Sequence, residues 1–538
     1  MMVVRKGALL ELTAERSAWS QRQWGVLGTM CLAAIVIVMD GSIVNVALPT
    51  LARELHGASN SRLQWIVDAY ILAFATLLMP AGGAADRFGR KKMLVLGLLA
   101  FAATSVGAAM ADSSMDLIAW RAMMGLGAAM IFPSTLAIIS DAFPDAKERS
   151  KAIAAWAGSS GLGVAIGPIA AGLLLEHGHW GWIFLVNLPL VLLAIGGVFW
   201  WVTESGDRTH ARLDCVGSAL SALGVFGVVL GLIEAPEVGW TSTFTVAAIS
   251  AGVVCLCVFI WWERRTTSPV LDMSCFLDRA FSAACLALAV AFFGLFGFVF
   301  MVTQYFQFIQ GCSALEAGVR TLPFAGFILV GALIAAWHAR VANRGGRLGS
   351  ALIMPAGLLL MAGGFMWASN DRAATPYLIM ACQMGLLGTG LGIVNAVGTA
   401  AIMGALPLDK AGTGSSVNDT LREVGGTLGV AALGSAFNAV YRSRIGHDLA
   451  GSPLPGEAHD AVRSSVGAAT EVITRVRGVA GEAAARALQD VVHASFLDGF
   501  RASCLIAVGA AIAGAACVFV LGLQASANSA GISTQRVE

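Results

Sequence analysis

Apolar runs long enough to cross a lipid bilayer follow one another along almost the whole chain. A transmembrane helix needs about 20 mostly apolar residues, and about fourteen runs reach that length. With 57% hydrophobic and only 12% charged residues, the chain has too little polar surface for several water-soluble domains. The sequence therefore predicts an all-helical, polytopic membrane protein. The runs lie near 24–48, 64–84, 93–111, 117–140, 152–175, 183–202, 215–234, 244–262, 281–308, 321–340, 348–368, 377–405, 413–440 and 496–523.

Basic residues are distributed unevenly among the loops between these runs. If the N-terminus is cytoplasmic, the short inner loops hold about 16 Lys and Arg residues and the short outer loops about 4, a bias typical of cytoplasmic loops. We therefore expect both termini in the cytoplasm. The net charge of +1 gives no reason to expect a nucleic-acid partner. The inner basic residues are Arg87, Arg90, Lys91, Lys92, Lys147, Arg149, Lys151, Arg208, Arg212, Arg264, Arg265, Arg279, Arg340, Arg344 and Arg347.

A weak internal repeat divides the chain into two halves. Residues 86–90 read DRFGR and residues 343–347 read NRGGR. Parallel repeats of this kind build two six-span halves in many transporters. We expect a cytoplasmic tail at 1–23, an N-terminal half at 24–203, a linker at 204–279 with two inserted spans, a C-terminal half at 280–523 and a tail at 524–538.

The one long outer loop, residues 441–494, carries apolar residues near helical spacing. This pattern predicts an amphipathic helix on the outer face, which serves either as a surface cap or as a lid over a substrate exit. The apolar positions are Val462, Val466, Ile473, Val476 and Val479.

The turn between the second and third runs, residues 82–92, reads GGAADRFGRKK. A turn that only fixes orientation would explain its basic residues but not its aspartate or its glycines. The turn resembles the signature between spans 2 and 3 of the major facilitator superfamily. The resemblance implies a gate in which Asp86 and Arg90 pair with Asp141, while Gly82 allows a helix of the other half to approach. The matching positions are Gly82, Asp86, Arg87, Gly89, Arg90 and Lys91.

Three ionisable residues lie inside runs of the N-terminal half. A carboxyl group deep in an apolar helix is costly, and such groups usually face a cavity or a proton path. Asp40 is the first choice for a proton carrier, although a purely structural carboxyl is the alternative. Asp68 lies about one turn inside its run and can equally line a cavity rim. Arg121 resembles the superfamily's span-4 arginine, with Met124 replacing the usual glutamine; it either tunes a carboxylate or anchors a helix end.

The fifth run contains small residues at spacings that let helices pack closely. Gly163, Gly167, Pro168 and Gly172 resemble a motif of the superfamily's antiporters, and Pro168 also interrupts the helix. Residues 180–189, WGWIFLVNLP, resemble a hallmark of the fourteen-span drug:proton antiporters. Further matches in family order extend from about residue 40 to about residue 430. The resemblance therefore implies the major facilitator fold with two inserted spans.

This resemblance implies proton-driven efflux of amphipathic drugs or antibiotics by alternating access. The expected setting is a bacterial inner membrane, the expected state a monomer, and the expected coupling ion a proton. We expect no enzyme activity, metal or organic cofactor, because the sequence shows no nucleophile and base constellation, metal cluster or phosphate-binding loop. A dedicated exporter of one metabolite, such as a self-made antibiotic, siderophore or amino acid, is the main alternative. A non-transporting membrane sensor is a further one.

Two expectations concern the C-terminal half and the inserted spans. From residue type and depth, the substrate cavity is expected to be lined by Phe300, Gln304, Tyr305 and Phe306. Asp419 and Arg422 lie three residues apart on one helix face, which predicts an ion pair. Glu234, at the outer end of the seventh run, is expected at the membrane interface.

Overall fold

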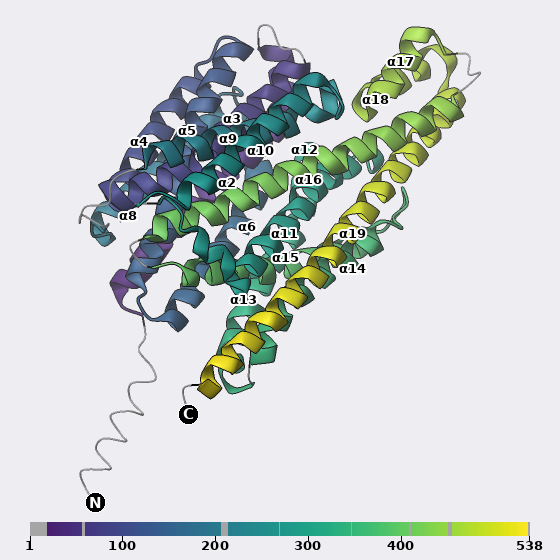
Figure 1. Ribbon diagram of the computed structural model, residues 1–538. Coiled ribbons are helices and arrows are strands. Elements are labelled where there is room, and N and C mark those ends of the chain that lie inside the picture. The colour runs from purple at the N-terminus through teal and green to yellow at the C-terminus, as the bar shows by residue number, and fades with distance from the viewer. Residues whose placement is uncertain are drawn as a thin grey trace, which may run out of the picture.

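A computed structural model of the chain describes residues 19–55, 60–205, 214–267, 269–345, 347–407, 410–449 and 454–535. These residues form helices joined by short turns (Figure 1). Within the described residues, thirteen helices are long and apolar enough to cross a membrane, and Leu352–Ala368 adds a shorter apolar helix. The prediction of an all-helical protein with fourteen membrane segments is confirmed.

The first half of the chain folds around its own apolar core. Polar side chains begin several of its helices by accepting hydrogen bonds from free backbone amides; Ser20 caps the first helix, and Asp145 accepts from Lys147 and Glu148. The helices are α2 (Gln21–Glu54), α3 (Asn60–Phe88), α4 (Arg90–Ala109), α5 (Ser114–Ala142), α6 (Ala146–His177), α7 (Trp182–Leu185) and α8 (Asn187–Trp201).

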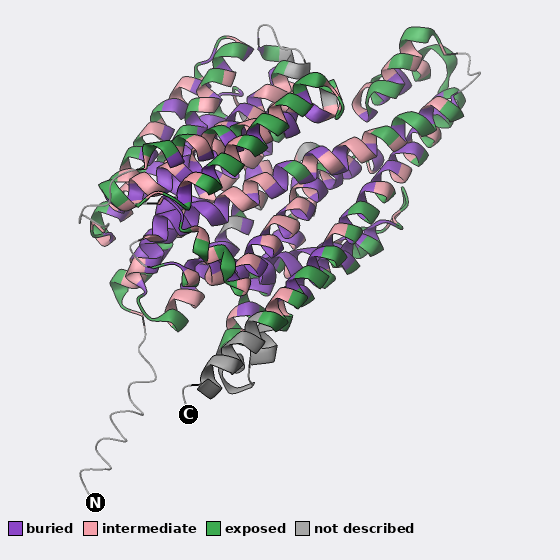
Figure 2. Ribbon diagram, viewed as in Figure 1, coloured by how far each residue is buried: buried purple, intermediate pink, exposed green. Residues whose placement is uncertain are grey.

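The second half surrounds a separate core, and buried residues concentrate inside each bundle (Figure 2). Its helices are α11 (Arg279–Gln304), the π-helical turn η3 (Tyr305–Ile309), α12 (Ala314–Arg320), α13 (Leu322–Gly345), α14 (Arg347–Ala368), α15 (Tyr377–Ala405), α16 (Ala411–Asp448) and α19 (Glu482–Gln535). The inserted helices α9 (Cys215–Val238) and α10 (Thr243–Glu263) pack against each other, and α9 also packs against α3 and α16.

The start of α2 and the end of α19 lie on one side of the molecule, which we call the termini side (Figure 1). The opposite side, the loop side, carries α17 (Gly456–Ser464) and α18 (Val466–Ala480). These two helices replace the single amphipathic helix that the sequence predicted, because the extended backbone at Ser465 ends the first and caps the second. Val462, Val466 and Ile473 are buried as expected, but Val479 is 92% exposed.

The last helix is longer than the sequence predicted. α19 takes in the end of the expected outer loop and continues through most of the expected tail. Its sequence is rich in alanine and contains no proline, so nothing interrupts the helix where the chain leaves the apolar run. Residues 1–18 of the N-terminal tail, Arg208, Arg212 and Gly346 lie outside the described residues.

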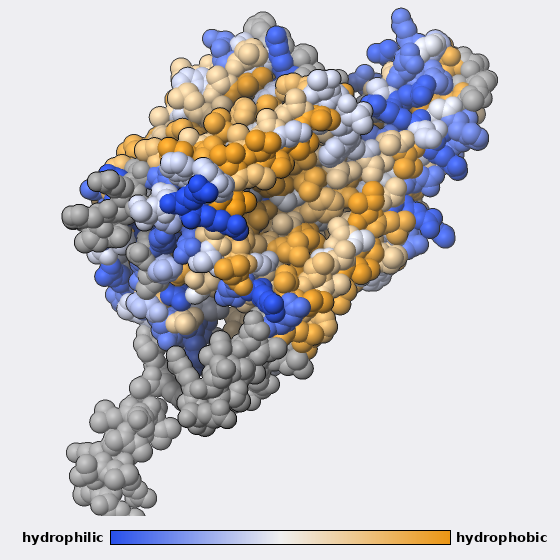
Figure 3. Space-filling view, in the orientation of Figure 1, coloured by the Kyte–Doolittle hydropathy of each residue, from blue (hydrophilic) through white to orange (hydrophobic). Residues whose placement is uncertain are grey.

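The surface matches a protein embedded in lipid. Hydrophobic residues gather over the middle of the face in view, whereas hydrophilic residues gather toward its ends and over α17 and α18 (Figure 3). α10 exposes several large apolar side chains, including Phe244, Val254 and Trp261. Such an apolar belt suits contact with acyl chains.

Candidate functional site

A charged cluster lies on the termini side between α3, α4 and α5. Arg90 begins α4, is 1% exposed, and donates to Asp86 Oδ1 through Nη2 at 2.8 Å. Its Nη1 lies 2.5 Å from Asp141 Oδ2. The buried guanidinium is therefore neutralised by two carboxylates from neighbouring helices, as the family resemblance implied.

Asp86 also joins the two halves of the molecule. Its Oδ1 accepts a hydrogen bond from the backbone amide of Gly412 at 2.8 Å, and its Oδ2 accepts from that of Thr413 at 2.9 Å. These amides belong to the first turn of α16, where backbone donors lack helical partners and the helix dipole favours a negative charge. We call Asp86, Arg90, Asp141, Gly412 and Thr413 the latch. The Thr413 hydroxyl also donates to Asp86 Oδ2, at 3.3 Å. The sequence did not predict Gly412 and Thr413 as partners, because two of the three bonds come from backbone amides, which carry no sequence signal.

Two glycines allow this geometry. A Cβ on Gly82 would lie 2.6 Å from the carbonyl oxygen of Gly412, so α3 and α16 can meet only without a side chain there. Gly89 has φ +108°, and a Cβ on it would lie 2.5 Å from Oε1 of Glu204. That carboxylate accepts from the backbone amide of Lys91, which ties the turn to the end of α8. Arg87 is exposed at the end of α3.

A second charged pair is buried in the middle of the N-terminal half. Asp40 on α2 and Arg121 on α5 are both 0% exposed, and Arg121 Nη1 lies 2.5 Å from Asp40 Oδ2. Asn187 donates to Asp40 Oδ1 at 2.9 Å. Arg121 Nε donates to the carbonyl of Ile66, and its guanidinium carbon lies 4.3 Å from the centroid of the Tyr70 ring. We call Asp40, Arg121, Asn187 and Tyr70 the Asp40 cluster.

The cluster decides between the two readings of Arg121. A fully buried guanidinium bound to a carboxylate does not anchor a helix end at the lipid headgroups. Met124, which stands where glutamine is usual, places its sulfur 3.9 Å from Arg121 Nη1 as a weak acceptor. The sequence missed Asn187 and Tyr70 as partners, although a lone asparagine beside a long apolar run was the available signal for the first.

The remaining acidic candidates lie elsewhere. Asp68 is half-buried on α3, two residues before Tyr70, and Glu234 is half-buried toward the loop-side end of α9. Asp419 and Arg422 lie on α16, both buried, with 3.5 Å between Asp419 Oδ1 and Arg422 Nη1. Asn418 donates a shorter bond of 2.9 Å to the same oxygen. Asp419 therefore accepts a hydrogen bond from Asn418 in addition to forming the expected ion pair with Arg422.

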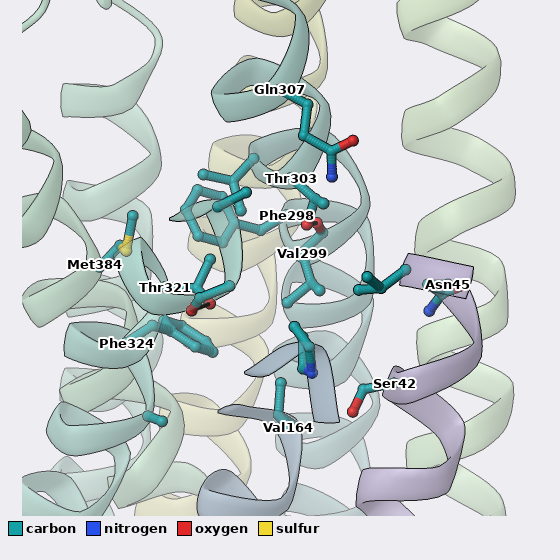
Figure 4. A pocket seen from close by; sticks show the side chains of 16 residues that line it. Ser42, Asn45, Val164, Phe298, Val299, Thr303, Gln307, Thr321, Phe324 and Met384 are labelled. Carbon is teal, nitrogen blue, oxygen red and sulfur yellow. Dashed lines mark hydrogen bonds between the residues drawn. The ribbon is translucent and has the colours of Figure 1, made fainter. Parts of the chain in front are cut away.

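A pocket lies between the two halves (Figure 4). Apolar side chains dominate its wall, and the polar groups among them are neutral. Ser42 and Asn45 come from α2. The same helix carries Asp40, two residues before Ser42. The other lining residues are Val46, Val164, Pro168, Phe298, Val299, Val302, Thr303, Gln307, Ala317, Gly318, Thr321, Phe324, Ala325 and Met384.

The four residues expected to line the cavity do not line this pocket. Tyr305 and Phe306 are 0% exposed within the C-terminal core, where the ring centroids of Tyr305 and Phe500 lie 5.8 Å apart. Phe300 is 41% exposed, and Gln304 donates to the Phe300 carbonyl. Other positions of the same helix, such as Thr303, reach the pocket instead. Residue type and depth did not predict this lining, because an almost wholly apolar helix does not reveal which face meets a cavity.

The glycines of α6 let it pack closely against α2 of its own half and against α12 of the other half. A Cβ on Gly163 would lie 2.9 Å from Val38 Cβ, and one on Gly167 would lie 2.9 Å from the Met39 carbonyl, both on α2. Gly172 faces Leu315 of α12 in the other half. Pro168 lines the pocket between these contacts. The motif thus lies where α2, the pocket and the C-terminal half meet.

Two helical halves, a polar latch joining them on one side, and a pocket between them define a membrane carrier of the two-domain type. The Major Facilitator Superfamily model matches residues 30–214 and 215–430. The chain belongs to this superfamily.

Its curated relatives include export proteins of several bacteria. It is 33% identical to the multidrug efflux pump LfrA of Mycolicibacterium smegmatis, over 95% of this chain and 98% of the relative. It is 32% identical to the tetracenomycin C resistance and export protein of Streptomyces glaucescens, over 92% and 91%. It is also 32% identical to the methyl viologen resistance protein SmvA of Salmonella typhimurium, over 86% and 91%.

Solved structures share the fold. The human organic anion transporter MFSD10 superposes with a TM-score of 0.59 at 14% identity, covering 92% of this chain and 99% of the other. An inward-facing bacterial homologue of the human lysosomal transporter Spinster gives a TM-score of 0.58 at 17% identity, covering 94% and 98%.

Proposed function

We propose that this chain exports amphipathic drugs or antibiotics across a bacterial inner membrane in exchange for protons. The names of the relatives support drug export, because they describe multidrug efflux and antibiotic resistance. The largely apolar, uncharged pocket supports a substrate held by shape and apolar contact. The basic residues of the turn at 82–92, on the termini side, support a cytoplasmic location for both ends of the chain.

The observation that carries the proposal is the position of Asp40. This carboxyl is fully buried on α2, and Ser42 and Asn45 of the same helix line the pocket within the next two turns. Protonation of Asp40 would break the charge balance with Arg121, which lies on α5. A substrate that displaces α2 and a proton that neutralises Asp40 would then act on one helix. Each ligand must weaken the binding of the other if they favour different states.

The latch would control the conformational change of the transport cycle. In the proposed cycle, the formed latch holds the two halves together on the termini side, so that the pocket would open toward the loop side. Breaking it would let the halves rock and expose the pocket to the cytoplasm, where substrate enters. Return of the proton from outside would reset the carrier.

A liposome experiment tests the proposal. The purified protein is reconstituted with an imposed pH gradient, and lipophilic cations and antibiotics are added singly. Several compounds should dissipate the gradient with the unchanged chain and none with Asp40→Asn. Asp112→Asn makes the same chemical change at an exposed loop position and should behave like the unchanged chain.

Two outcomes would change the proposal. Dissipation by one compound only would favour the alternative, a dedicated exporter of a single metabolite. Binding of a compound without any flux would favour a membrane sensor.

A further inference from the structure

A second contact between the halves lies deeper than the latch. Arg422 is ten residues beyond Gly412 on α16, which places it about 15 Å further from the termini side. The residue is 6% exposed, and its side chain points across the interface toward α5 and α6. Nothing in the proton-exchange scheme above uses this buried cation.

Aromatic rings surround the Arg422 guanidinium. Its central carbon lies 4.4 Å from the centroid of Phe292 on α11, 5.5 Å from that of Phe132 on α5 and 5.6 Å from that of Trp156 on α6. Phe292 belongs to the same half as Arg422, whereas Phe132 and Trp156 belong to the other. A guanidinium within about 6 Å of a ring centroid is attracted by the ring quadrupole, most strongly where water is excluded.

Polar partners of Arg422 are few. Among the described residues, Asp419 alone accepts a hydrogen bond from the guanidinium, and that bond is long at 3.5 Å. A guanidinium has five N–H donors and is costly to bury unless it is compensated. The rings of the N-terminal half therefore add to the compensation that Phe292 and Asp419 of its own half provide.

The two N-terminal rings are held rigidly in place. Trp156 is 0% and Phe132 4% exposed, and their centroids lie 5.3 Å apart. Trp156 Nε1 donates to Thr135 Oγ1 at 3.1 Å, which fixes the indole. Phe132 also packs against Phe74, and Phe74 against Tyr70, whose ring supports Arg121 of the Asp40 cluster. A row of packed rings therefore connects Arg422 to the buried Asp40–Arg121 pair of the other half.

We propose that Arg422 is a positioning residue of the transport cycle, docking onto Phe132 and Trp156 to hold the termini side closed. When the halves separate there, the guanidinium leaves the two rings and only Phe292 and Asp419 remain beside it. The contact deepens the proposed alternating-access cycle, but it can be measured without substrate or a pH gradient. Its failure is therefore distinguishable from failure of proton-coupled export.

Spin-label distances across the termini side test this contact. Labels on noncanonical amino acids at position 92, exposed in the N-terminal half, and position 277, exposed two residues before α11 of the C-terminal half, leave the ten cysteines unchanged. Arg422→Gln and Phe132→Leu should each shift the distance distribution toward the open population, by about three- to tenfold in the open-to-closed ratio. Arg422→Lys should be intermediate, because an ammonium packs less well on a ring.

The double variant separates a direct contact from two unrelated effects. Arg422→Gln with Phe132→Leu should shift the ratio no further than Arg422→Gln alone, since Phe132→Leu removes part of the interaction that Arg422→Gln already removes. Arg444→Gln, at a half-exposed arginine further along α16, should leave the distances unchanged. Additive shifts, or no shift with Phe132→Leu, would overturn the proposal. If Arg422→Gln does not fold, Phe132→Leu and Trp156→Leu carry the same test.

Discussion

The carboxylate of Asp86 accepts a 2.8 Å hydrogen bond from the backbone amide of Gly412, 326 residues further along the chain. One side chain at the end of α3 thereby caps the first turn of α16 and joins the two halves. The same carboxylate neutralises Arg90, which is bound to Asp141 as well. Closure of the termini side thus depends on a small set of short polar contacts, and each of them can be changed singly.

Removing the charge of Asp86 should weaken closure without removing the pocket. Asp86→Asn loses the ion pair with Arg90 and the charge that favours the N-terminus of α16, a cost of about 1–3 kcal/mol. We expect transport to fall roughly tenfold or more while ligand affinity changes little. Binding and flux measured on the same preparation check this. Loss of binding would instead assign the turn to the substrate site. Lys92→Gln, an exposed change in the same turn, is the control.

Adjacent glycines in the turn should differ sharply in their tolerance of alanine. The new methyl group of Gly82→Ala would lie 2.6 Å from the Gly412 carbonyl oxygen and should prevent full closure. At Gly83 the nearest atom to a Cβ is Val270 Cγ1, at 3.8 Å, so Gly83→Ala should transport normally. Transport rates of the two variants at equal expression provide the comparison. Equal loss, or none in either, would contradict the close approach of α3 and α16.

Variants of the Asp40 cluster should distinguish an effect on protein stability from an effect on proton coupling. Asp40→Asn leaves the Arg121 charge buried without its carboxylate, a change that typically costs about 3–5 kcal/mol. Arg121→Gln in the same chain removes the stranded charge. The double variant should therefore recover thermal stability in detergent but not the dissipation of a pH gradient. If Asp40→Asn kept full coupling and Asp68→Asn abolished it, Asp68 and not Asp40 would be the proton carrier.

Asp371, in the loop between α14 and α15, should make stability depend on pH. Burial raises the pKa of this carboxyl from 3.8 to about 6, although Gln383 donates to it at 2.8 Å. Since the folded state holds this proton more tightly than the unfolded state, stability should fall as pH rises from about 4 to about 6.

Asp371→Asn keeps the acceptor for Gln383 and removes the charge. With the partial exposure of Asp371 taken into account, it should stabilise the protein by about 1–2 kcal/mol at pH 7.5 and have little effect at pH 4. Thermal unfolding at both pH values checks this, with Asp112→Asn as the exposed control. A gain of equal size at the two pH values would show that the charge is not responsible.

Several features could be predicted from local patterns in the sequence. The fourteen apolar runs required a helical membrane bundle, because buried backbone in lipid must satisfy its own hydrogen bonds. Asp40 and Arg121 were recognisable because a charge inside an apolar run needs a partner. Asp86 and the glycines of the turn were recognisable by spacing. Val479, by contrast, was expected on a buried helix face and is exposed, because six residues of helix after the buried Ile473 place it on a different face of α18.

The sequence by itself determined the number of membrane segments, their helical form and the residues that cannot be left unpaired, because these follow from local composition and the cost of polar groups in lipid. Only the tertiary structure decided which partners those residues meet: Asn187 beside Asp40, Gly412 beside Asp86, and the rings of Phe132 and Trp156 beside Arg422. It also decided that Thr303 and not Tyr305 faces the pocket. An apolar helix can bury any face, and the packing of distant helices alone selects one.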